Sequence, residues 1–152
     1  QVNSGHPGGS LGCTEFMVTL YFKIMNINKE FTMDGKNEDL FFLSNGHISP
    51  VFYSVLARVG YFPVSELKTF RKINSRLQGH PTTHEGLPGV RIASGSLGQG
   101  FSVAIGAAIT KKLNQEKTKI TELVTGKTNL DTLLDCSIRN TRNYWFWFTC
   151  KV

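Results

Sequence analysis

The chain has 152 residues, of which 40% are hydrophobic and 18% charged, and its formal net charge is +6. These values are typical of a soluble globular protein of about one domain, and they exclude a disordered chain. No run of about 18 apolar residues is present, so the sequence predicts no transmembrane helix and no membrane partner. The basic residues of 111–152 form no dense block, so a nucleic-acid partner is disfavoured, and an anionic small ligand suits the positive charge equally well.

The cysteines and the first residues bear on the compartment. Cys13, Cys136 and Cys150 are an odd set without Cys-x-x-Cys spacing. This favours a reducing compartment, hence a cytoplasmic protein, over a disulfide scaffold or a zinc site. The first residues lack the basic start and apolar core of a signal peptide. Because the chain starts at Gln1 without a methionine, we expect further sequence upstream.

The first predicted elements are a helix and a strand. Apolar residues recur at helical spacing over residues 11–27 (Phe16, Leu20 and Ile24), which predicts a largely buried helix. A polar loop over residues 28–39 follows. The apolar run 40–43 predicts a short buried strand, which ends where Ser-Asn-Gly supplies turn chemistry.

Helices and one long loop follow the predicted strand. Pro50 and Gly60 suit the first turn and the end of a helix, and Ser65 suits the cap of a further short helix. Residues 74–95 are loop-like, and a loop of this length in a compact domain is usually functional. Residues 98–113 predict a helix of small residues whose amino end offers free backbone N–H groups.

The character of the chain changes after Gln115. Residues 116–143 are polar with weak periodicity, and five consecutive aromatic residues follow at 144–148. The order of the earlier elements predicts an α/β domain. We expect residues 1–115 to form this partial domain and residues 116–152 to be a divergent tail that need not have a native fold. A shift of reading frame, or the joining of an unrelated sequence, would explain the change.

Three of the four histidines lie beside glycine in segments that do not favour helix interior. His6 lies in Ser-Gly-His-Pro-Gly-Gly, His47 in Leu-Ser-Asn-Gly-His, and His80 in Gly-His-Pro. Gly-Ser-Leu-Gly-Gln-Gly follows at 95–100. This pattern indicates imidazoles presented from loops where a ligand or backbone comes close. Structural roles in loops are the alternative for these histidines. His80 and His84 are four residues apart, but Pro81 between them disfavours a helix, and so disfavours a helical metal-binding pair.

Taken in this order and spacing, the motifs resemble those of the transketolase family over residues 2 to about 114. The resemblance implies a partial, incomplete thiamine-diphosphate-binding fold of the α/β class, with a parallel sheet flanked by helices. It also implies a pentose phosphate pathway transferase that moves a two-carbon ketol unit between phosphorylated sugars, using thiamine diphosphate and Mg²⁺. Its partner would be a second copy of the chain or a complementary carboxy-terminal subunit.

The resemblance also implies roles for particular residues. His6 and His80 would face the sugar near the reacting carbon of the cofactor, and His47 would contact both the diphosphate and the substrate side. Gly95, Ser96 and Leu97 would lie against the cofactor. The family usually has proline where this chain has Ser96, which is of similarly small size. Imidazoles suit such a site because they donate and accept protons near neutral pH.

The chain departs from the family pattern at the metal site. The family's Gly-Asp-Gly after the small-residue helix is missing, and Asp131 and Asp135 stand in a different context. We therefore expect no metal ligand from this chain. The family's second domain, which carries the glutamate that activates the cofactor, is also missing from this sequence. The alternative to an enzyme fragment is a non-catalytic degenerate fragment, or a subunit that acts only by association.

Overall fold

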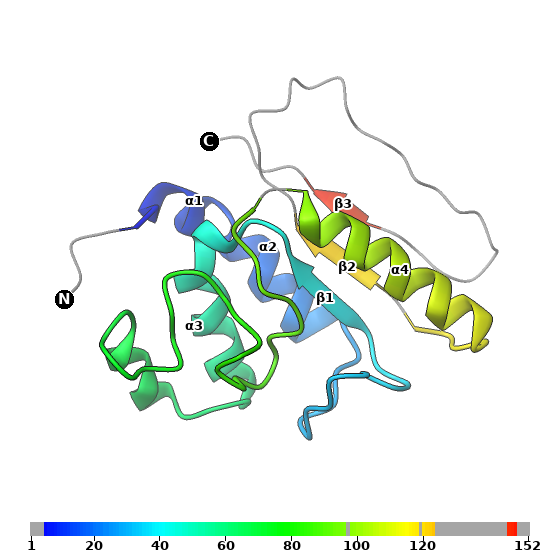
Figure 1. Cartoon of the computed structure of the whole chain (residues 1–152), viewed down its shortest axis with the longest axis horizontal. Helices are drawn as coiled ribbons and strands as arrows, with labels where there is room; N and C mark the ends of the chain where they lie inside the picture. The colour runs from blue at the N-terminus through cyan, green and yellow to red at the C-terminus, as the bar shows by residue number, and fades with distance from the viewer. Residues whose placement is uncertain (1–4, 97, 119, 124–145, 149–152) are drawn as a thin grey trace.

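The computed structural model describes residues 5–96, 98–118, 120–123 and 146–148, and Figure 1 shows their arrangement. The elements in chain order are α1 (Pro7–Gly12), α2 (Thr14–Thr19), the π-helical turn η1 (Leu20–Ile24), β1 (Leu40–Leu43), η2 (Gly46–Ile48), α3 (Ser49–Val59), η3 (Val64–Thr69), α4 (Gln99–Leu113), β2 (Ile120–Leu123) and β3 (Phe146–Phe148). The three strands lie in the order β1-β2-β3, and β2 pairs in parallel with both β1 and β3. In Figure 1, α4 runs beside β2 and β3, whereas α2 and α3 lie on the other side of β1.

β1 is buried on both faces, as the apolar run predicted. Phe41 and Leu43 belong to the main core with residues of α2 and α3, whereas Leu40 and Phe42 pack in a second cluster with α4. All four side chains are at most 5% exposed. A strand that is covered by helices on both faces needs no polar alternation, which explains its uninterrupted apolar sequence.

The first helical segment differs from the single helix predicted over residues 11–27. Helical structure already begins at Pro7, is interrupted at Cys13, and ends in the π-helical turn η1. Met17 and Leu20 are buried, but Ile24 is 42% exposed. The wider π turn breaks the spacing of 3.6 residues, so Ile24 leaves the buried face on which the pattern placed it.

The later helices agree with the sequence, apart from η3. α3 ends at Gly60, which has the left-handed conformation (φ 105°) that favours glycine there. α4 follows Gly98 as predicted, and no helix or strand occurs within 74–95. The short helix predicted to begin at Ser65 instead begins at Val64 as a 3₁₀-helix after Pro63, whose extended backbone precedes the first turn.

Buried charges fix the polar loop before β1. Glu38 accepts a hydrogen bond from the Asn28 N–H and pairs with Arg91 at 2.6 Å, and both side chains of this pair are at most 6% exposed. Lys111 of α4 donates to the Gly35 carbonyl oxygen at 2.7 Å. Although the sequence reads only as polar here, the loop is tied to Arg91 and to α4 through Glu38 and Gly35.

No helix among the described residues has both the length and the apolar character needed to cross a bilayer.

Two predictions concern segments that are described only in part. Of the aromatic run 144–148, residues 144 and 145 lie outside the described residues. Most of 116–152 lies outside them as well, so the division at residue 115 and the change of reading frame stay predictions.

Candidate functional site

Three histidines from separate segments meet beyond the carboxyl end of β1. His6 precedes α1, His47 lies in η2, and His80 lies in the loop 74–95. The His47 ring centroid is 5.0 Å from that of His6 and 4.8 Å from that of His80, with edge-to-face geometry in both pairs. The carboxyl ends of parallel strands are where α/β folds usually bind ligands. The motifs that the sequence singled out therefore form one cluster.

His47 is the central and least exposed member of this cluster. Its Nδ1 lies 3.1 Å from Asn45 Oδ1, and because an amide oxygen can only accept, Nδ1 carries the hydrogen. Burial lowers the pKa of His47, and its electrostatic interactions with His80 and His6 lower that pKa further. His47 is accordingly a neutral imidazole at neutral pH, with Nε2 as an acceptor. His6 and His80 are exposed, so they can reach a ligand from solvent.

Glycines permit the close approach of the segments that carry His47 and His80. A Cβ on Gly46 would lie 2.7 Å from the carbonyl oxygen of Ser94. A Cβ on Gly95, which has φ +140°, would lie 2.9 Å from Cδ2 of His80. The contact at Gly46 is with backbone and excludes a side chain there, in agreement with the close approach that the sequence indicated. At Gly95 the positive φ disfavours a side chain, and His80 would have to move to accommodate one.

The amino end of α4 lies against the end of β1. The Gly98 N–H donates to Ser44 Oγ at 3.1 Å, and a Cβ on Gly100 would lie 2.6 Å from Ser44 Cβ. Ser96 is exposed just before this helix, and Leu97 lies outside the described residues. The helix end thus directs N–H groups and its positive dipole toward the edge of β1 from which the histidine segment continues.

Several residues of this region carried no recognisable signal in the sequence. Ser49 and Tyr53 of α3 donate to the carbonyl oxygens of Gly79 and Gln78, at 2.6 and 3.0 Å respectively. Ser44, which the sequence indicated only as a turn residue before His47, is fully buried beneath the amino end of α4. The spacing of Ser49 and Tyr53 by four residues on a predicted helix places them on one face, and this is the only pattern that could have linked them.

No metal site is evident in the part of the chain that the structure describes. Within it, no group of three or more His, Cys, Asp or Glu side chains could hold a metal ion. Asp131 and Asp135, which the sequence placed outside the family's metal motif, lie beyond the described residues.

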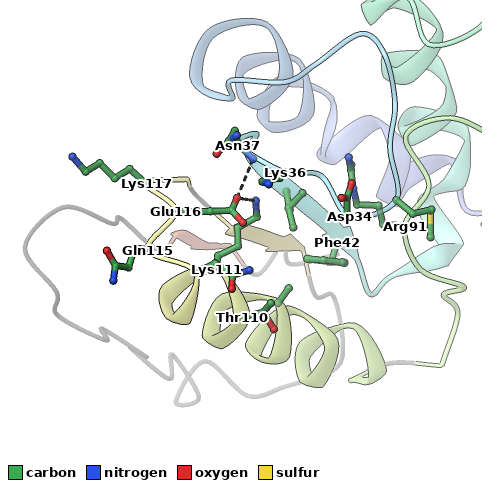
Figure 2. Close-up of a pocket in the computed structure, with 14 residues that line it drawn as sticks. Asp34, Lys36, Asn37, Phe42, Arg91, Thr110, Lys111, Gln115, Glu116 and Lys117 are labelled. Atoms are coloured by element: carbon green, nitrogen blue, oxygen red, sulfur yellow. Dashed lines mark hydrogen bonds and ion pairs between the residues drawn. The ribbon is translucent and has the colours of Figure 1, made fainter.

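A cavity of about 950 Å³ lies at the opposite end of β1 from the histidines (Figure 2). Leu40, Phe42 and the end of α4 line it. Figure 2 shows that Lys111 and Glu116 point toward each other at its wall, where they pair at 2.7 Å. None of the three clustered histidines lines this cavity, so it is separate from the histidine cluster.

Comparisons with known proteins agree with the motifs. The family model described as "Transketolase, thiamine diphosphate binding domain" matches residues 1–128. The chain is 38% identical over 116 residues to one subunit of the Apulose-4-phosphate transketolase of Actinobacillus succinogenes, and the match covers 76% of this chain and 41% of that protein. It is 42% identical over 109 residues to the transketolase of Pongo abelii, covering 72% of this chain and 17% of that protein.

A solved structure extends this similarity to the fold. The chain superposes on a crystal structure of a transketolase variant from Pichia stipitis with a TM-score of 0.69 and 31% sequence identity. The match covers 81% of this chain but 19% of the other. The chain thus spans less than half the length of the relatives that it matches.

Proposed function

Because the chain belongs to the transketolase family, through that family's thiamine diphosphate-binding domain, we propose that it supplies part of a ketol-transferring site. The reaction would be the transfer of a two-carbon ketol unit between phosphorylated sugars, in the pentose phosphate pathway of the cytoplasm. The observation that carries this proposal is the contact of three imidazoles beside the amino end of a helix.

The described residues fit the phosphate end of thiamine diphosphate. The amino end of α4 offers backbone N–H groups and a positive dipole, and its cap residue, Gly98, brings no side chain. A Cβ on Gly98 would meet no protein atom within 4 Å, so the space at the cap of this helix is open. We assign cofactor contacts to His47, Gly95, Ser96 and Leu97. When bound, the cofactor would supply the electron sink for cleavage of a carbon–carbon bond.

The histidines would handle protons and orientation. His47 is held by Asn45 with Nε2 as an acceptor, so it would accept a hydrogen bond from the ligand. His6 and His80 flank it and are exposed, so they would donate protons to sugar hydroxyls and accept protons from them. The ring contacts keep all three imidazoles within reach of one small molecule.

The site would be completed by another chain. One relative is named as a subunit of an Apulose-4-phosphate transketolase, which suggests an enzyme of separate subunits. We infer a complementary carboxy-terminal subunit or a second copy of this chain as the partner. Exposed Val103, Ile109 and Leu113 of α4 offer an apolar surface for it. In the complete domain, β1, β2 and β3 would be part of a helix-flanked parallel sheet.

Magnesium would be part of this proposal as the partner of the cofactor's diphosphate, and among the described residues no group of three or more His, Cys, Asp or Glu side chains is present to hold it. The second candidate function is that of a non-catalytic, associating subunit. It is favoured by the absence of the family's Gly-Asp-Gly from the sequence. The two functions differ in whether the chain binds the cofactor at all.

Calorimetric titration of the purified chain with thiamine diphosphate, with and without Mg²⁺, tests the proposal. We expect binding that weakens in a His47→Gln variant, while His84→Gln, a histidine outside the cluster, binds like the wild type. Heat of binding that is the same for both variants would contradict the assigned site. No binding by the wild type, with or without a carboxy-terminal partner domain, would favour the non-catalytic subunit.

A further inference from the structure

Two hydroxyl groups of α3 hold the backbone directly before His80. Ser49 donates to the Gly79 carbonyl oxygen, and Tyr53, one turn later, donates to the Gln78 carbonyl oxygen. Ser49 and Tyr53 are each 1% exposed, so both hydroxyl groups donate from the buried face of α3. One face of α3 thus grips two consecutive peptide groups of the loop 74–95.

This grip links two members of the histidine cluster. His47 lies in η2, which continues directly into α3, so His47 and Ser49 belong to one rigid segment. On the far side of His80, the Ser94 N–H donates to the Pro81 carbonyl oxygen at 3.1 Å. The backbone is therefore held by hydrogen bonds on both sides of His80. The bond on the amino-terminal side comes from Ser49, two residues after His47.

We propose that Ser49, supported by Tyr53, is a positioning residue that sets the contact between the His47 and His80 rings. A role for this contact in catalysis rests on the proposed function, whereas the contact between the two rings is present in the structure whatever the function is. Ser49 acts through the Gly79 carbonyl group, and in the proposed site it touches neither substrate nor cofactor.

Removal of the hydroxyl has a specific physical consequence. A buried carbonyl group that loses its donor turns toward solvent to find another, because an unmade buried hydrogen bond is costly. Rotation of the Gly79 peptide group would carry His80 away from His47. Tyr53 would still hold Gln78, because the substitution leaves its hydroxyl and its hydrogen bond in place. The change is thereby confined to Gly79 and His80.

The test is an NMR titration of the 152-residue chain labelled with ¹⁵N-histidine. Because His80 is one of the causes of the lowered pKa of His47, Ser49→Ala should raise that pKa toward 6.5 and weaken the proton contacts between the two rings. Ser54→Ala is the matched control. Ser54 lies on the same helix but is exposed, and its hydroxyl bonds only to Pro50 of that helix. Ser49→Thr, which keeps a hydroxyl, should retain the wild-type pKa.

An unchanged His47 pKa with unchanged ring contacts in Ser49→Ala would overturn the proposal, as would an equal change in Ser54→Ala. If Ser49→Ala lost its dispersed amide spectrum, Ser49→Cys would give the same test at the same position, because a thiol is a much weaker hydrogen-bond donor than a hydroxyl. Failure of the proposed function is distinguishable, because it would show as absent thiamine diphosphate binding in the wild type. The His47 pKa would still respond to Ser49→Ala in that case.

Discussion

The approach of α4 to the end of β1 makes a substitution at Gly100 sharply different from the same substitution elsewhere on that helix. In Gly100→Ala, the new Cβ would lie 2.6 Å from Ser44 Cβ and 2.8 Å from Ser44 Cα. The second contact is to backbone, so it cannot be relieved by rotation of a side chain. In Gly106→Ala, by contrast, the new Cβ meets nothing within 4 Å.

The expected magnitudes have opposite signs. Alanine gains about 0.5–1 kcal/mol over glycine in a helix through its backbone entropy. Overpacking costs about 1–3 kcal/mol, and the backbone contact at Gly100 places it near the upper end. We therefore expect Gly100→Ala to lower the free energy of unfolding by about 2 kcal/mol, from the difference of these terms. Gly106→Ala should raise the free energy of unfolding by about 0.5–1 kcal/mol.

Urea denaturation followed by circular dichroism at the helix band measures both changes. With a denaturant slope of about 1–3 kcal/mol/M, the Gly100→Ala midpoint should fall by roughly 1 M. Because Gly98 donates to Ser44, the displaced helix end should also weaken thiamine diphosphate binding. A Gly100→Ala protein as stable as Gly106→Ala would refute the reasoning, since only the contact with Ser44 separates the two variants.

Three further predictions follow from buried groups. Glu38→Ala should lower the free energy of unfolding by about 3–5 kcal/mol, because Arg91 would stay buried without its carboxylate; the more exposed pair of Glu66 should cost at most about 1 kcal/mol, and equal thermal shifts would argue against this. His47 has a lowered pKa, so the unfolded chain binds more protons than the folded chain below about 6.5. Stability should therefore fall as pH drops through that range, and less steeply in His47→Gln, as urea midpoints would show. Leu56→Ala in the main core should cost about 2–5 kcal/mol, and a loss under about 1 kcal/mol would mean that the core refills the space.

The parts of the fold that the sequence predicted carry strong local signals. β1 is an apolar run that ends in turn residues, and α3 is bounded by Pro50 and Gly60. The η1 turn was missed because a π turn has no signature in apolar spacing, and so Ile24 was expected to be buried. The start of η3 was predicted one residue too late. Serine is a common cap residue, so Ser65 marked the start of the helix in the sequence, whereas in the structure Pro63 precedes its first residue.

The histidines of the candidate site could be predicted from the sequence, whereas the residues that hold them in place could not. Their glycine and proline neighbours mark His6, His47 and His80 as loop residues close to a ligand or to another backbone segment. The structure brings the three side chains together. Their functional roles stay predictions. The hydrogen bond from Ser49 to Gly79 spans 30 residues and ends on a backbone carbonyl group, which leaves no trace in the sequence. In the sequence, Glu38 likewise looks like an ordinary charged loop residue, and only the structure shows that it forms a buried ion pair with Arg91.

The burial of β1 on both faces has a consequence for how its register is defined. In a strand with one wet face, a slip by one residue would expose its apolar side chains, and this penalty fixes the alignment. Here such a slip would only exchange Phe41 and Leu43 for Leu40 and Phe42, so hydrophobicity hardly distinguishes the two alignments. The distinction comes from polar residues that bracket the strand. Buried Glu38 and Asp39 are anchored before it, and buried Ser44 is anchored after it.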